Sequence, residues 1–114
     1  MKTWIVRISS SAQHDFDNIV AWTAEHFGIR QASTYAATLS LAIAALMRGP
    51  QQTGVRQRDD ILHGAMTFHV ARRGRRGRHF IVVRVMGNRP RPTIEILRIL
   101  HDAMDLPRHV PGAD

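Results

Sequence analysis

The segment Ile-Glu-Ile-Leu-Arg-Ile-Leu-His-Asp-Ala-Met-Asp, residues 94–105, decides how the rest of the chain is interpreted. An almost unbroken apolar run ends abruptly there in a polar, ionisable tail. β-branched and aliphatic residues in such a run are typical of a strand that is covered on both faces. We therefore predict a buried strand that runs into a short surface helix. Arg98 interrupts the apolar run, and a charge in that setting needs a partner.

The composition indicates a single globular domain, residues 1–114, with a strong positive charge. Hydrophobic residues make up 44% and charged residues 22%, as in ordinary globular proteins, and a chain of this length can bury a core without metal or disulfides. Sixteen Lys and Arg residues against nine Asp and Glu give a net charge of +7. Lys2 is the sole lysine, and guanidinium groups favour carboxylates and phosphates. The composition therefore points to an acidic partner, either nucleic acid or an acidic protein segment.

The sequence contains no cysteine, which excludes disulfides, thiolate metal sites and thiol nucleophiles. The apolar residues near the N-terminus are interrupted at Arg7, too early for the core of a signal peptide. The longest uninterrupted apolar run, residues 41–47, is far shorter than the roughly 20 residues that cross a bilayer. We expect a cytoplasmic protein with no membrane association.

Two amphipathic helices are predicted upstream of the opening segment. Residues 3–8 alternate as in a strand, and the serines that follow can cap a helix. Apolar residues of 12–27, Phe27 among them, fall on one helical stripe, and a glycine follows as the expected C-terminal cap. A second stripe covers residues 32–47, and Gly49-Pro50 ends it. Because the connection is so short, the helices must form an antiparallel hairpin.

Strands are predicted again after the helices. Residues 51–64 show no sustained period and are interpreted as a loop. Apolar residues recur with period two in 66–71, and 80–86 is an apolar strand with one charged residue. The arginine turn, residues 72–78, joins these strands and holds five arginines in seven positions. Residues 87–92 contain two prolines and turn the chain into the opening segment.

This order of elements predicts an α+β domain. It consists of an N-terminal strand, an antiparallel helical hairpin, a three-stranded antiparallel meander and a short C-terminal helix. The helices should cover one face of a mainly antiparallel sheet. The other face should be partly open, or covered by the C-terminal tail or by a partner.

The arginine turn has two interpretations that the sequence leaves open. It could bind phosphate or an acidic peptide, or it could be a solvated hairpin loop. No aromatic residues are interleaved with the arginines, so a platform for stacking bases is not visible. Trp22 lies about 120° off the first helical stripe. It belongs either to the edge of the core or to an exposed contact, and we favour the core edge.

Arg84, Arg98 and His101 form a second set of interest, because a cation and a histidine could bind a phosphate and move a proton. RNA cleavage at a 2′-hydroxyl would use such groups. Arg98 and His101, however, are an odd number of residues apart and point to opposite faces of a regular strand. We favour a structural role in which Arg98 pairs with a carboxylate such as Asp102 or Asp105, or with terminal carbonyls, and fixes the tail. The histidines lack the spacing of a metal ligand set, and we expect neither a metal nor a cofactor.

Several stretches of the chain resemble ParE toxins of the RelE/ParE superfamily. They are Ala-Trp-Thr-Ala-Glu-His-Phe-Gly at 21–28, Gln31-Ala32, Gly49-Pro50, residues 96–105, and Arg108-His109. The resemblance covers nearly the whole chain, and the terminal pattern around residues 96–105 is its most specific part. The predicted order of elements agrees with the fold of that superfamily.

The resemblance implies a toxin of a type II toxin-antitoxin module that inhibits DNA gyrase and is neutralised by a ParD-like antitoxin. RelE relatives cleave messenger RNA on the ribosome and carry a tyrosine or a His-Tyr pair near the C-terminus. Here the corresponding tail has His101-Asp102 and no tyrosine. We therefore favour a non-catalytic gyrase inhibitor, and a ribosome-dependent mRNA endonuclease using Arg84, Arg98 and His101 is the alternative.

Two separate surfaces are expected from this resemblance, and no sequence-specific binding of nucleic acid by the toxin alone. The target should contact the tail at His101, Asp102, Met104, Asp105 and Arg108. The acidic segment of the antitoxin should fold onto Trp22 and the arginine turn at Arg72, Arg73, Arg75, Arg76 and Arg78.

Overall fold

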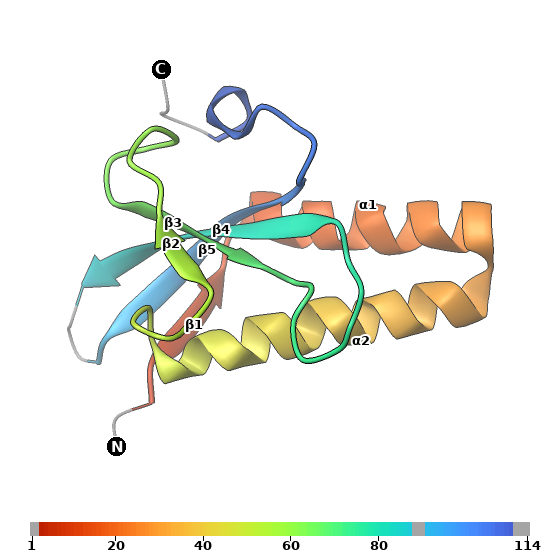
Figure 1. Cartoon of the computed structure of the whole chain (residues 1–114), viewed down its shortest axis with the longest axis horizontal. Coiled ribbons are helices and arrows are strands. Elements are labelled where there is room, and N and C mark those ends of the chain that lie inside the picture. The colour runs from red at the N-terminus through yellow and green to blue at the C-terminus, as the bar shows by residue number, and fades with distance from the viewer. Residues whose placement is uncertain (1–2, 88–90, 111–114) are drawn as a thin grey trace.

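A helical hairpin covers one face of a five-stranded sheet (Figure 1). The computed structural model describes residues 3–87 and 91–110. The sheet has the order β1-β5-β4-β3-β2, in which β1 and β5 are parallel and the other neighbours antiparallel. The α+β class and the mainly antiparallel sheet are confirmed. In chain order the elements are β1 (Ile5–Ile8), α1 (Ser10–Phe27), α2 (Ile29–Ala45), the 3₁₀ helix η1 (Leu46–Arg48), β2 (Val55–Gln57), β3 (Ala65–His69), β4 (His79–Gly87), β5 (Thr93–His101) and the 3₁₀ helix η2 (Leu106–Arg108).

Two elements differ from the prediction. Residues 55–57, predicted as loop, form the edge strand β2, which pairs with β3 and places Val55 opposite Phe68. Three residues are too few to show a period, so backbone pairing decides this strand. The predicted C-terminal helix is replaced by a turn and by η2, a single 3₁₀ turn. In that turn Ala103 N donates to His101 Nδ1 at 3.1 Å and Met104 N donates to the His101 carbonyl at 3.0 Å.

The first helix of the hairpin, α1, is capped at both of its ends. Ser9 Oγ accepts a hydrogen bond from Ala12 N at 3.0 Å, which begins α1, and donates to the Leu97 carbonyl at 3.0 Å, which ties that cap to β5. Gly28 is the single residue between the helices. Its φ of 90° is open to glycine at little cost, and its N–H ends α1 on the Ala24 carbonyl. The antiparallel hairpin is confirmed, with a connection even shorter than predicted.

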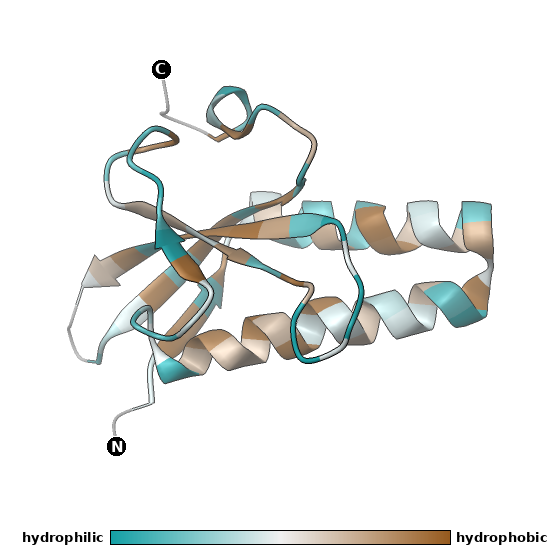
Figure 2. Ribbon diagram, viewed as in Figure 1, coloured by the Kyte–Doolittle hydropathy of each residue, from teal (hydrophilic) through white to brown (hydrophobic). Residues whose placement is uncertain are grey.

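The sheet carries apolar packing on both faces, and brown strands run through its centre in Figure 2. Leu39, Phe68 and Ile96 belong to the main core between helices and sheet. On the opposite face Leu106 and Val110 of the tail pack with other buried residues of β4, β5 and the 61–65 segment. Of the alternatives left open for the second face, the structure has the one in which the tail covers part of it.

The far end of the hairpin projects beyond the sheet (Figure 1). Phe27, predicted to face the core, is 65% exposed, and Trp22 is 54% exposed. Both interpretations as core residues are wrong. The period of a helix shows which residues share a face, and it does not show where the neighbouring sheet stops.

Arg98 and Asp15 form the contact that joins α1, β5 and the tail. β1 ends at Ile8, which pairs with Ile96, so the edge of β5 beyond that point has no strand beside it. Asp15 Oδ2 accepts the free Ile99 N–H at 2.9 Å. Arg98 donates to both carboxylate oxygens of Asp15, at 2.7 and 2.9 Å, and to the His109 carbonyl at 2.6 Å. The carboxylate thus takes the place of the missing strand.

The structural role predicted for Arg98 is confirmed in one respect and wrong in another. Its hydrogen bond to the His109 carbonyl is the predicted contact with the tail. Its carboxylate partner is Asp15, neither Asp102 nor Asp105. The partner lies 83 residues away in the sequence, beyond the reach of any local pattern.

We expect Asp15→Asn to lower the free energy of unfolding by about 2–3 kcal/mol, because it leaves the half-buried Arg98 guanidinium without a counter-charge. Urea denaturation measures this. Asp17→Asn is the matched control and should change stability by less than about 0.5 kcal/mol, since Asp17 lies on the same helix and accepts a hydrogen bond from the exposed Gln13 side chain. Equal effects of the two substitutions would contradict the anchoring role.

Candidate functional site

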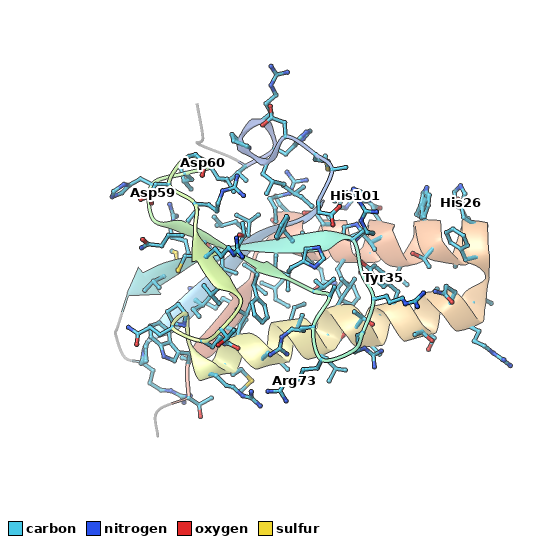
Figure 3. All side chains as sticks on the ribbon, in the orientation of Figure 1. His26, Tyr35, Asp59, Asp60, Arg73 and His101 are labelled. Atoms are coloured by element: carbon cyan, nitrogen blue, oxygen red, sulfur yellow. The ribbon has the colours of Figure 1, made fainter. Side chains whose placement is uncertain are left out.

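A largely apolar groove of about 620 Å³ opens between the helical hairpin and the start of β4. α1 and α2 form one side, and the arginine turn, β4 and the end of β5 form the other. Figure 3 places Tyr35 and His101 beside the sheet and His26 farther out along α1. The groove residues that matter most for chemistry are Trp22, Tyr35, Arg76, Arg78, His79 and His101.

One wall of the groove is aromatic and exposed. Trp22 stacks on His26 with 4.1 Å between ring centroids, and Phe27 meets Trp22 edge to face at 5.8 Å. The wall exists because this part of α1 has no sheet beneath it (Figure 1). Large exposed apolar rings that are grouped in this way are typical of a protein contact.

A tyrosine and two histidines meet at the inner end of the groove. The Tyr35 hydroxyl accepts the Arg78 N–H at 3.1 Å and lies 2.6 Å from His79 Nδ1. Because that hydroxyl already accepts the Arg78 N–H and its own proton needs an acceptor, we assign the hydroxyl as the donor to Nδ1, and with this assignment the His79 proton lies on Nε2. The His79 ring meets the His101 ring edge to face at 5.3 Å.

The electrostatic setting keeps the Tyr35–His79 pair neutral. Burial, and after it the charge of the neighbouring His101, lowers the pKa of His79 to about 4. Burial also raises the pKa of the Tyr35 phenol. At neutral pH the pair therefore offers a proton acceptor or donor without carrying a charge.

The arginine turn is held against α2. Arg75 donates to Thr38 Oγ1 at 2.9 Å and to the Thr34 carbonyl at 3.1 Å. A Cβ at Gly77 would stand 2.5 Å from a Val70 methyl carbon, so only glycine allows this close approach. The interpretation as a merely solvated loop is wrong for this part of the turn.

The other arginines of the turn point in different directions. Arg72 lies over the Phe68 ring at 5.0 Å from its centroid. Arg73, which is labelled in Figure 3, is exposed at the tip of the turn, and its φ is 52°. Arg76 and Arg78 line the rim of the groove. The five arginines are therefore not one binding patch.

Asp102 joins the arginine turn to the tail. Its carboxylate accepts from Arg78 Nε at 3.0 and 3.1 Å and from His69 Nε2 at 3.0 Å, and its own N–H donates to the Arg78 carbonyl at 2.8 Å. The bonds from Arg78 and then His69 lower the pKa of Asp102 to about 2. Arg78 and Asp102, which the sequence analysis assigned to different surfaces, form an ion pair, so the two predicted surfaces adjoin at this point.

The proposed nuclease trio is not assembled. Arg84 lies opposite Glu95, whereas His101 lies opposite His79, six positions and roughly 20 Å farther along β5. The Arg98 guanidinium forms an ion pair with Asp15. His101 instead meets His79, which in turn contacts Tyr35, and the sequence analysis selected neither His79 nor Tyr35. Tyr35 and His79 are 44 residues apart, and only the alternation at the start of β4 hinted that His79 faces the helices.

The tail presents exposed side chains on a fixed backbone. Met104 is 38% exposed, and the Arg108 side chain is 81% exposed and pairs with Asp105 at 3.2 Å. Leu106 and Val110 are buried beneath them. His101 is the one residue of the predicted target set that also lines the groove.

Within residues 3–87 and 91–110, no three His, Asp or Glu side chains are grouped so that they could hold a metal ion. Over the same residues, neither helix has the length and apolar character that crossing a membrane requires.

Comparisons with known proteins give a consistent picture. Residues 6–106 match the family described as the ParE toxin of the type II toxin-antitoxin system parDE. Toxin ParE1 of Caulobacter vibrioides is 32% identical over 104 residues, which cover 91% of this chain and 95% of that protein.

Solved structures share the fold. A chain from the chromosomal ParDE toxin-antitoxin system of P. aeruginosa superposes with a TM-score of 0.72 at 20% identity, covering 89% of this chain and 98% of that one. A chain from the RelBE2 toxin-antitoxin complex of Mycobacterium tuberculosis gives a TM-score of 0.54 at 24% identity, covering 87% and 98%.

We expect His79 to remain neutral above about pH 5 in the folded protein, since its pKa is about 4 there and about 6.5 in an unfolded chain. Between these values the unfolded state binds the proton, so the stability that neutral His79 contributes above pH 6.5 is lost as the pH falls toward 4. NMR titration of its imidazole signals and denaturation at several pH values measure both effects. His79→Asn should flatten the loss of stability with falling pH, and an unchanged slope would contradict the assignment.

Proposed function

This chain belongs to the ParE toxin family of type II toxin-antitoxin systems, and we propose that it inhibits DNA gyrase by binding it and is neutralised by a ParD-like antitoxin. Family membership over residues 6–106 is the observation that carries the proposal. The choice of gyrase as target rests on that membership. Binding alone needs no metal or cofactor, and the proposed target and partner assign the protein to the cytoplasm.

The proposed contact with gyrase is the tail, at His101, Asp102, Met104, Asp105 and Arg108. Two sets of hydrogen bonds hold this segment against the rest of the domain. Arg98 bonds the His109 carbonyl, and Asp102 bonds Arg78 and His69. A segment whose backbone is held in this way loses little conformational freedom on binding, which favours recognition by its exposed side chains.

The proposed contact with the antitoxin is the groove, together with the arginine turn. Its aromatic wall at Trp22 suits the apolar face of an amphipathic helix, and Arg76 and Arg78 at the rim suit acidic residues beside that face. Antitoxin segments that fold on binding lose entropy, and charge-assisted bonds together with apolar burial offset that loss. The net charge of +7 also speeds the encounter with an acidic partner.

Neutralisation follows from the shared geometry. An antitoxin segment in the groove would cover His101, and a contact with Arg78 would compete with Asp102 for the same guanidinium. Occupation of the groove and binding of the target through the tail would then exclude each other.

A ribosome-dependent mRNA endonuclease remains the second candidate, on one specific observation. His79 contacts both Tyr35 and His101, and Arg76 and Arg78 line the same groove, so a neutral imidazole shares this groove with cations that could hold a phosphate. Of the trio expected from the sequence, only His101 belongs to this cluster. The tail still lacks a tyrosine, and we place gyrase inhibition first.

We expect the purified toxin to reduce supercoiling by gyrase, and the double substitution Met104→Ala with Arg108→Ala to weaken inhibition at least about tenfold by removing exposed tail contacts. A gel assay of supercoiling measures this. Met86→Ala with Arg56→Ala is the matched control, because these side chains are exposed on other parts of the sheet. Unaffected gyrase together with cleavage of ribosome-bound message, lost in His101→Gln, would establish the nuclease instead.

We expect Trp22→Ala to weaken antitoxin binding about 30-fold, as is usual for an aromatic anchor in an interface. Calorimetry with the antitoxin encoded beside this toxin measures the affinity. Trp22 is half exposed, so the fold should tolerate its loss. Met86→Ala serves as control for loss of an exposed apolar side chain elsewhere, and an equal affinity for both variants would exclude the groove as the antitoxin site.

A further inference from the structure

A second, smaller hollow of about 260 Å³ lies between α2 and the arginine turn. The turn runs alongside α2 (Figure 1), and the bond from Arg75 to Thr38 joins the two. Arg76 and Arg78 line the groove instead. The arginines that line the hollow are Arg48, Arg72, Arg73 and Arg75. The hollow is therefore separate from the groove and from the tail, and Arg48 of η1 adds a charge from outside the turn.

Separate contacts place the guanidiniums around the hollow. Arg72 is half-buried over the Phe68 ring, and Arg75 uses two of its five N–H donors on Thr38 and on the Thr34 carbonyl. Arg73 lies at the exposed tip, with a φ in the left-handed region that residues other than glycine rarely adopt. Backbone strain of this kind is often found where a turn holds a ligand.

The positive charges of the hollow are not balanced by neighbouring carboxylates. Of the ion pairs within residues 3–87 and 91–110, none includes an arginine that lines the hollow. Burial, and after it the charges of Arg73 and Arg48, lower the pKa of the Arg72 guanidinium, as expected where like charges lie close together. The negative end of the α2 dipole can balance part of the charge of Arg48. The remaining repulsion would be relieved by a bound anion.

The size and lining of the hollow favour a compact anion. Its volume is below the roughly 300–1,000 Å³ of sites for drug-sized molecules. The rest of the lining is mainly apolar, with Leu41, Ala42, Ala44, Ala45 and Val70, and an apolar wall strengthens the attraction between opposite charges. A nucleic-acid strand spreads its phosphates over a length that such a hollow cannot enclose.

The number of guanidiniums indicates how much negative charge the ligand carries. Guanidinium forks match phosphate oxygens and bind them in pairs. A single phosphate monoester carries a charge of about −1.5 to −2. A second phosphate joined to it adds further charge within a small volume. A diphosphate group therefore balances three guanidiniums better than a carboxylate or a single phosphate does.

We propose that the hollow between α2 and the arginine turn binds a diphosphate group through the guanidiniums of Arg48, Arg72 and Arg73. The group belongs to inorganic diphosphate or to a nucleoside diphosphate. In the second case the nucleoside would rest on Leu41, which is 53% exposed beside the hollow. The inference does not rest on the choice of gyrase as target.

The experiment titrates the full chain with inorganic diphosphate and with adenosine 5′-diphosphate, at constant ionic strength and without divalent cations. Calorimetry measures the affinity, and NMR of the arginine side-chain N–H signals locates the site. We expect Arg72→Gln and Arg73→Gln each to weaken binding about tenfold, because each removes a charge-assisted contact. Arg73 is exposed, so its loss tests the site even if Arg72→Gln disturbs the packing on Phe68.

Arg30→Gln is the matched control, because it removes the same charge from an exposed position at the other end of α2. It should weaken binding by less than about twofold, through the change in net charge alone. An equal loss in Arg30→Gln and Arg73→Gln, or diphosphate binding no tighter than sulfate, would overturn the proposal.

Further arms of the experiment identify the source of the group. Tighter binding of adenosine 5′-diphosphate, with the gain lost in Leu41→Ala, would support a nucleoside diphosphate. Equal binding of the two compounds would support inorganic diphosphate. Tighter binding of a 5′-phosphorylated oligonucleotide or of a Glu-rich peptide at the same arginines would overturn the proposal in favour of a macromolecular partner. Supercoiling by gyrase is measured separately, so failure of one proposal is distinguishable from failure of the other.

Discussion

The pairing of Asp15 with Arg98 is the constraint on which the arrangement of the functional surfaces depends. β5 is longer than β1, and its free edge would leave a backbone N–H without a partner in a partly buried position. One carboxylate satisfies that N–H and the guanidinium of the neighbouring residue together. The same guanidinium then reaches the His109 carbonyl. The cluster of Asp15 and Arg98 therefore sets three things together. It fixes the position of α1, the length of β5 and the path of the tail.

The groove forms because the two helices are longer than the sheet that they cover (Figure 1). α1 and α2 continue past the strands (Figure 1), and the aromatic residues near the end of α1 pack against one another and stay exposed. The arginine turn folds back to meet them, which Gly77 permits and Arg75 fixes. Apolar surface that would be core in a smaller hairpin becomes available to a partner here. Such a surface is consistent with a protein that spends much of its existence bound to another chain.

The parts of the structure that could be predicted from the sequence are those governed by local periodicity. Both helices, their glycine junction, and the strands β3, β4 and β5 were predictable because a repeating pattern and nearby caps define each of them. β2 could not be predicted, since three residues carry no period. The partner of Arg98 and the pair of Tyr35 with His79 connect segments 83 and 44 residues apart, and only the folded topology brings them together. Exposure of Trp22 depends on where the sheet stops, which helix periodicity does not report.

The number of arginines in the turn is a poor guide to how the turn binds a partner. Five arginines in one turn suggest a single binding patch, yet Arg75 and Arg78 are committed to Thr38 and Asp102, and Arg72 lies over an aromatic ring. The ion pair of Arg78 and Asp102 cancels charge where the turn meets the tail, so an acidic partner must compete with an internal carboxylate for that guanidinium. A partner that wins this competition would leave the Asp102 carboxylate with His69 as its remaining side-chain donor among the described residues. Binding at the groove would thereby reach the tail through one hydrogen-bonded pair, and the two surfaces would be coupled by chemistry as well as by proximity.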